Sequence, residues 1–193
     1  MIAPLALSMA GILVLAPSIS HLLQNVSGYF PDFLDFSVIP SLIFANDMGG
    51  APLAMEFATN EQVGYYNALI VSAMMGVTIS FNIPFAMGVV DKDRHEPLLL
   101  GLLCGIITTP VGCLVSALIV GLSITDLLAS LIPLLVCAIL LAVALFLWPR
   151  ACVKVFKVFG VIINTIILFG LAVGIFEGLT GIELVPYILT LQW

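Results

Sequence analysis

Long apolar stretches with few charged residues make up most of the chain, and short polar segments separate them. Five of these stretches each supply about 20 or more residues, the length that an α-helix needs to cross a bilayer. They cover residues 1–30, 62–90, 97–125, 127–149 and 154–177. A sixth stretch, residues 33–58, is interrupted at its centre by Asn46-Asp47-Met48-Gly49-Gly50. The pattern predicts an all-α polytopic membrane protein with five full transmembrane helices and one broken or re-entrant helical hairpin.

The two arms of the interrupted stretch are short. They run from about Leu34 to Ala45 and from Ala51 to Ala58. At about 1.5 Å of rise per residue, neither arm spans the hydrocarbon core alone. The favoured interpretation is a hairpin that enters the membrane and returns to the same side. The alternative is a single broken crossing, which would place the N-terminus on the other side.

The composition agrees with a membrane protein: 62% of the residues are hydrophobic and 8% are charged. Soluble domains carry about 25% charged residues. Because no polar linker or low-complexity tract divides the chain, residues 1–193 are expected to form a single transmembrane domain. The chain lacks a nucleophile elbow, a phosphate-binding glycine loop and a basic cluster suited to nucleic acid, so neither an enzyme, a cofactor nor a nucleic-acid partner is expected.

All five basic residues fall in two short regions, and both regions are expected to be cytoplasmic by the positive-inside rule. The first region contains Lys92 and Arg94, and the second contains Arg150, Lys154 and Lys157. This places the connection at residues 123–126 and the region around Glu183 on the opposite side. The first apolar stretch has no basic residue ahead of it and is too long for a signal-peptide core, so it is interpreted as a span. Met1 is either the true start or an internal methionine of a longer protein.

Metal binding is not expected. The four cysteines lie in or at the ends of apolar spans without a Cys-x-x-Cys pair, and they are interpreted as small packing residues. The two histidines, His21 and His95, are far apart in sequence, and His95 is placed in the first cytoplasmic loop.

Asp47 is the first candidate for a functional residue. A carboxylate at the middle of a membrane helix costs about 2.5–3.5 kcal/mol on insertion scales, so such a residue usually handles an ion or a substrate. Gly49 and Gly50 let the chain leave the helix there, and Asn46 adds an amide. Together Asn46, Asp47, Gly49 and Gly50 resemble the broken helices that bind substrates in transporters. The structural alternative is that Asp47 only caps the second arm.

Four further polar residues are candidates for lining the same pathway, each with a structural alternative. Glu56 lies near the end of the second arm, where a carboxylate is often merely solvated. Thr78 and Asn82 share one helix face beside Pro84, and they either line a site or form interhelical hydrogen bonds. Thr109 precedes Pro110, where a hydroxyl commonly restores hydrogen bonding that the proline interrupts.

Small residues recur at helical spacing in three places and predict faces where helices approach closely. The first face is Ser72, Gly76 and Ser80; the second is Gly101, Gly105, Gly112 and Ser116; the third is Gly170, Gly174 and Gly178. The third face is interpreted as a packing surface within the chain, for a partner subunit or for a complementary second half.

Three ordered blocks resemble a known family. They run from Phe44 to Gly50, from Ala68 to Pro84 and from Leu100 to Cys113, and they are similar to the ethanolamine-utilisation permease family of the EutH type. The likeness covers the N-terminal half of what that family normally contains, since its members carry an additional helix before this start and a second half after this end.

This resemblance implies a multi-pass protein of the bacterial inner membrane that admits ethanolamine, a small cationic amine, by secondary transport or facilitated diffusion. Asp47 would then be the counter-ion of the amine. The missing half implies that the chain is a fragment, pairs with a second copy or joins a complementary half. Two alternatives remain: a nucleoside-type or other polar-metabolite carrier, and a membrane assembly subunit that transports nothing.

Overall fold

The computed structural model describes the backbone of residues 2–181 and the side chains of residues 14, 15, 17–162, 165, 166 and 168–181. Every regular element in this part of the chain is a helix, which confirms the all-α prediction. The region around Glu183 lies outside the described residues. In chain order the elements are α1 (Ile2–Ser27), α2 (Val38–Ile43), η1 (Asn46–Met48), α3 (Gly50–Phe57), α4 (Glu61–Tyr66), η2 (Asn67–Gly76), η3 (Thr78–Asn82), α5 (Ile83–Val89), η4 (Lys92–Arg94), α6 (His95–Val120), α7 (Ile124–Leu147) and α8 (Pro149–Thr180).

Among the described residues, three helical stretches are long and apolar enough to cross a membrane. They are Glu61–Val89, Lys92–Val120 and Ile124–Leu147, and in the first of them α4, η2, η3 and α5 follow one another without a break. The prediction of five full spans is therefore not confirmed. α1 and α8 are long helices as well, and part of the side chains of each lies outside the described residues; the described part of α8 includes the apolar segment Leu168–Thr180.

The turn between α6 and α7 lies nearer the N-terminus than the sequence predicts. Gly121 adopts a left-handed conformation with φ 75° and ends α6. Ser123 then caps α7, because its side chain accepts a hydrogen bond from the backbone N–H of Asp126. The turn is thus residues 121–123, and Asp126 belongs to the first turn of α7 rather than to the connection. His95 also differs from its prediction: it is buried at the start of α6, with Nε2 2.9 Å from the carbonyl oxygen of Val90.

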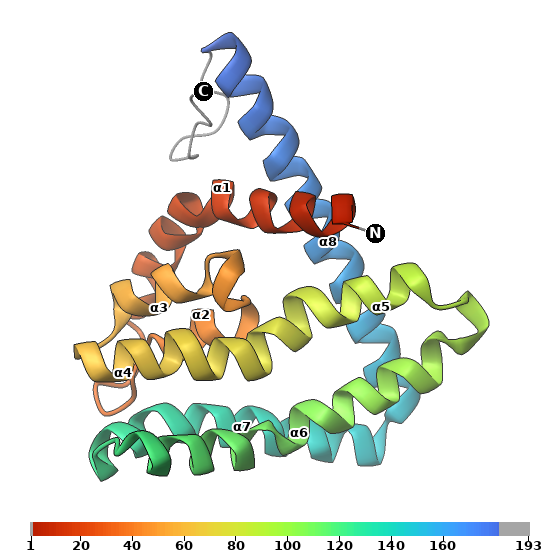
Figure 1. The fold of residues 1–193 in the computed structure, drawn as a ribbon. Helices are drawn as coiled ribbons and strands as arrows, with labels where there is room; N and C mark the ends of the chain where they lie inside the picture. Colours follow the sequence, from red (N-terminus) through yellow and green to blue (C-terminus); the bar gives the residue numbers. More distant parts are fainter. Residues whose placement is uncertain (1, 182–193) are drawn as a thin grey trace.

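The interrupted stretch folds into a hairpin. α2 forms the first arm, η1 forms the tip, and α3 returns beside α2 as the second arm (Figure 1). The two ends of the hairpin meet, since the backbone N–H of Thr59 donates a 2.9 Å hydrogen bond to Oδ2 of Asp35. The hairpin packs along η2, the middle of the first membrane-spanning helix.

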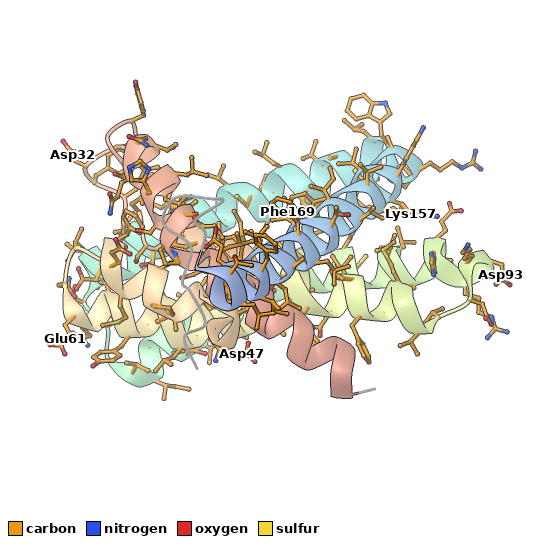
Figure 2. The ribbon with its side chains drawn as sticks, turned by 90° about the horizontal axis from the view of Figure 1, so that it is seen from above. Asp32, Asp47, Glu61, Asp93, Lys157 and Phe169 are labelled. Carbon is orange, nitrogen blue, oxygen red and sulfur yellow. The ribbon has the colours of Figure 1, made fainter. Side chains whose placement is uncertain are left out.

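Several charged residues mark the two ends of the molecule. Figure 2 places Asp93 and Lys157 toward one end and Asp32 and Glu61 toward the other. Lys92 and Arg94 flank Asp93, and the other two basic residues precede Lys157 on α8, so the two basic regions share one end as the positive-inside argument expects.

α8 crosses the other helices steeply and packs against α1 (Figure 1). Glycine makes this contact close: a Cβ atom at Gly170 would lie 2.4 Å from the side chain of Leu15, and one at Gly174 would lie 2.6 Å from that of Val14. The third small-residue face is therefore a packing surface, as predicted. At Gly170 and Gly174 this face packs against α1 of the same chain. These two positions are therefore not available for contact with a partner subunit or a second half.

Candidate functional site

Two breaks in helical geometry build the tip of the hairpin. Phe44 and Ala45 are extended, and Gly49 adopts φ 91°, a left-handed conformation that favours glycine. Gly50 is required for a second reason, because a Cβ atom there would lie 2.4 Å from the carbonyl oxygen of Phe44. The glycine pair thus forms the turn that the sequence predicts.

The first membrane-spanning helix holds the tip through its own small-residue face. Ser80 is buried, and its Oγ accepts a 2.9 Å hydrogen bond from the backbone N–H of Ala45. Gly76 lies directly against the hairpin, where a Cβ atom would be 2.0 Å from the carbonyl oxygen of Phe44 and 2.7 Å from that of Ser41. The predicted face of Ser72, Gly76 and Ser80 is confirmed, and it positions the extended backbone just before Asn46 and Asp47.

Asp47 is exposed at the tip, and Asn46 beside it is half-buried. Figure 2 places Asp47 between the two charged ends of the molecule. Within the described part of the chain, the carboxylate makes no hydrogen bond or ion pair. The structural alternative, in which Asp47 caps α3, is not seen, because Gly49 occupies the N-cap position of that helix. The carboxylate is therefore exposed at the tip of the hairpin, between the two charged ends of the molecule.

The structure brings Asn46, Asp47, Gly49 and Gly50 together but does not join the other four predicted residues to them. Glu56 lies near the opposite end of α3, where its Oε1 accepts hydrogen bonds from Ser20 Oγ at 2.6 Å and Gln24 Nε2 at 3.0 Å. It ties α3 to α1. Glu56 is thus exposed and bonded to α1, and its role along a pathway stays a prediction.

Of the remaining three side chains, Thr78 and Asn82 are half-buried and Thr109 is buried. Thr78 Oγ1 donates to the carbonyl oxygen of Met74 at 3.0 Å, and Thr109 Oγ1 donates to that of Gly105 at 3.3 Å. Both threonine hydroxyls thus bond within their own helix in the described residues, so a role for Thr78, Asn82 or Thr109 in a pathway stays a prediction.

A buried polar network at the base of the hairpin was missed by the sequence reasoning. Asp35 is fully buried, and its two carboxylate oxygens accept hydrogen bonds from the backbone and hydroxyl groups of Ser37 and Thr59. Asn67 Nδ2 donates to Ser37 Oγ at 2.8 Å and to Ser130 Oγ at 3.1 Å. The available signal was Asp35-Phe36-Ser37 directly before a helix, a typical capping sequence.

The helix that faces this network is unusual. η2 and η3 are π-helical over 10 and 5 residues, whereas π-helix normally occurs as single turns, frequently at functional sites. Asn67 contacts the base of the hairpin through Ser37, and Ser72 lies five positions after Asn67, about one π-helical turn along the same helix. Both are fully buried, and Oδ1 of Asn67 and Oγ of Ser72 have no hydrogen-bond partner in the described structure.

No group of three or more His, Cys, Asp or Glu side chains that could hold a metal ion occurs among the described residues. The four cysteines are free; Cys113 is buried and Cys104 and Cys137 are exposed. The site is therefore built from carboxylate, amide, hydroxyl and backbone groups.

Comparison with known proteins gives one consistent family. The family model described as "Ethanolamine utilisation protein, EutH" matches residues 1–192. A protein of Listeria monocytogenes named "Probable ethanolamine permease EutH" is 37% identical over 184 residues, which cover 94% of this chain and 49% of that protein. Proteins of the same name from Salmonella typhimurium and Escherichia coli are 35% and 34% identical, again over 94% of this chain and 48% of each relative. The chain spans about half the length of these relatives, and no solved structure matches it.

Proposed function

The chain belongs to the EutH family of ethanolamine utilisation proteins, and from this membership we propose that it forms part of a membrane transporter for ethanolamine or a similarly small cationic amine. The relatives that it matches are named as probable ethanolamine permeases. The observation that carries the proposal for this chain is the exposed carboxylate of Asp47 at the tip of the hairpin.

A charge in this position requires a partner, and the residues that the structure describes offer no basic side chain nearby. All five Lys and Arg residues lie in the two regions at one end of the molecule. An uncompensated carboxylate at membrane depth is costly, and a protonated amine removes that cost by charge neutralisation and charge-assisted hydrogen bonds. Asn46 supplies an additional amide oxygen that can accept a hydrogen bond from the ammonium or hydroxyl group of ethanolamine.

We propose that α1 and α8 add two spans to the three helices described above, so that the hairpin re-enters a bundle of five. The basic end faces the cytoplasm of a bacterial inner membrane, and the hairpin enters from the opposite side. This orientation places Asp47 near mid-membrane, with the base of the hairpin near the outer surface. At the tip, the carbonyl groups at the C-terminal end of α2 present the negative end of the helix dipole to the bound amine.

The complete pathway is proposed to need more than one copy of this half-length unit. Transporters built from repeats commonly hold substrate between them, so a second copy or a complementary half would cover Asp47 from the side that is open here. Transport then proceeds by secondary transport or by facilitated diffusion as the surrounding helices change access. Glu56, Thr78, Asn82 and Thr109 remain proposed secondary positions along this pathway.

Uptake of radiolabelled ethanolamine into proteoliposomes tests the proposal, with competition by unlabelled ethanolamine, methylated amines and nucleosides. At pH 6, where passive diffusion of neutral amine is least, we expect saturable uptake that small amines inhibit and nucleosides do not. Inhibition by nucleosides would instead favour a polar-metabolite carrier. An assembly subunit would show no saturable uptake, while Asp47→Asn would reduce complex formation.

A further inference from the structure

The base of the hairpin holds a negative charge without a positive partner. Asp35 is fully buried, yet no basic side chain forms an ion pair with it in the described structure, and the five basic residues lie toward the other end. Its hydrogen bonds come from neutral groups: the backbone N–H of Ser37 at 2.9 Å, that of Thr59 at 2.9 Å and the hydroxyls of both residues. Buried charges are normally paired or bound to metal ions.

The directions of the hydrogen bonds identify a second buried acceptor near this charge, Oδ1 of Asn67. Ser37 Oγ donates its only proton to Asp35, so toward Asn67 it acts as an acceptor. The amide of Asn67 must therefore present its NH₂ group to Ser37, and the same group also donates to Ser130 Oγ at 3.1 Å. This leaves Oδ1 of Asn67 fully buried without a partner. A buried acceptor of this kind costs about 1–3 kcal/mol, which calls for a compensating ligand.

From these observations we infer that the cluster of Asp35, Ser37, Asn67 and Ser130 is a binding site for a monovalent cation, Na⁺, separate from the amine site at Asp47. Its ligands are a carboxylate oxygen of Asp35, the hydroxyl oxygens of Ser37 and Ser130, and the amide oxygen of Asn67 after the amide turns over. Hard cations prefer such all-oxygen sites. A single carboxylate balances a single positive charge, which favours Na⁺ over a divalent ion.

The change on binding is small and uses only hydroxyl and amide rotation. The two backbone N–H groups of Ser37 and Thr59 continue to hold the carboxylate, while the hydroxyl proton of Ser37 turns away and frees a lone pair for the ion. Asn67 then directs Oδ1 rather than NH₂ toward the hydroxyl oxygens. The ion thereby balances the charge of Asp35 and binds Oδ1 of Asn67, while the NH₂ group moves to the position that Oδ1 holds in the ion-free structure.

Because of its location, a bound ion would link the base of the hairpin to the helices around it and so affect the position of the tip. The cluster joins three elements: the base of the hairpin, the π-helix η2 and α7, whose Ala129 carbonyl oxygen accepts from the backbone N–H of Asp35 at 3.2 Å. The same α2 arm connects this base to Ala45, directly before Asn46 and Asp47. Occupancy of the site therefore fixes the hairpin against the bundle. This inference concerns ion binding alone and does not depend on the identity of the amine.

The test is ion binding to the purified chain in detergent, measured by ²²Na⁺ scintillation proximity and by the melting temperature in NaCl against choline chloride at equal ionic strength. Wild type is expected to bind ²²Na⁺ saturably and to melt at a higher temperature in NaCl. Ser130→Ala removes one ligand and should weaken Na⁺ binding about tenfold. Asn67→Leu and Asp35→Asn should abolish it.

Asp126→Asn is the matched control, because Asp126 is an acid on α7, one turn from Ser130. Among the described residues, its carboxylate accepts a side-chain hydrogen bond from Asn60 at 3.2 Å and makes no hydrogen bond to the cluster. It should bind Na⁺ as wild type does. Ser130→Ala keeps the test decisive if Asp35→Asn does not fold. Absence of saturable ²²Na⁺ binding in folded wild type, unchanged binding in folded Ser130→Ala and Asn67→Leu, or a melting temperature that follows pH but not Na⁺ would overturn the inference.

Discussion

Substituting Gly76 by alanine should displace the tip of the hairpin from the helix that carries Gly76. The added Cβ atom would lie 2.0 Å from the carbonyl oxygen of Phe44, whereas ordinary contact begins at 3.4 Å, so the two segments must separate by about 1.4 Å along this line. A second oxygen, that of Ser41, is 2.7 Å away on the same side and blocks a simple tilt. Both atoms belong to backbone, which cannot rotate aside as a side chain can.

Overpacking of this kind costs about 1–3 kcal/mol. For a chain of this size that corresponds to a fall in melting temperature of about 2–12 °C. Gly101→Ala on α6 is the matched control, because nothing lies within 4 Å of a Cβ atom there. In a helix, alanine is more favourable than glycine by about 0.8–1.0 kcal/mol, so this control should be neutral or more stable.

The assay is thermal unfolding of the purified chain in detergent, followed by circular dichroism, together with binding of labelled ethanolamine. Gly76→Ala should melt below wild type and bind amine more weakly, because Asp47 moves with the tip. A melting temperature of Gly76→Ala at or above that of Gly101→Ala would refute the expected clash with the hairpin.

Three further predictions concern the hairpin and its orientation. Ser80→Ala leaves the backbone N–H of Ala45 buried without its acceptor and should destabilise the chain by about 1–3 kcal/mol in the same unfolding assay; an unchanged melting temperature would contradict it. Thr59→Ala removes a hydroxyl donor from the buried carboxylate at the hairpin base and should cost about 1.5–3 kcal/mol, whereas Thr59→Ser should retain most of the stability. Cysteine introduced at Lys157 should react with an impermeant thiol reagent only from the cytoplasmic side, and cysteine at Asp32 only from the outside; equal labelling of both from one side would refute the proposed orientation.

Sequence reasoning located the tip of the hairpin because its signals are local. Gly49 and Gly50 interrupt an apolar stretch, and the structure uses both, one for its left-handed φ and one for its close approach to Phe44. The face of Ser72, Gly76 and Ser80 was predictable for the same reason, since its spacing alone places small residues together. Its partner was not predictable.

Asp35 was missed because its environment is tertiary. In the sequence it resembles an acid at the membrane surface, and only the return of α3 and the approach of α7 bury it. The π-helical geometry of η2 also has no signature in a run of apolar residues. Conversely, Gly170 and Gly174 signalled close packing, but sequence spacing does not say which helix fills the space, and the structure assigns it to α1.

The measurement that tests the central claim most directly is equilibrium binding of radiolabelled ethanolamine to the purified chain in lipid nanodiscs at pH 6. Wild type, Asp47→Asn and the control Asp32→Asn, an exposed acid outside the hairpin, are compared. If Asp47 is the counter-ion of the amine, wild type and Asp32→Asn bind saturably, and Asp47→Asn binds at least about tenfold more weakly. Equal affinity in folded Asp47→Asn and wild type would contradict the proposed role.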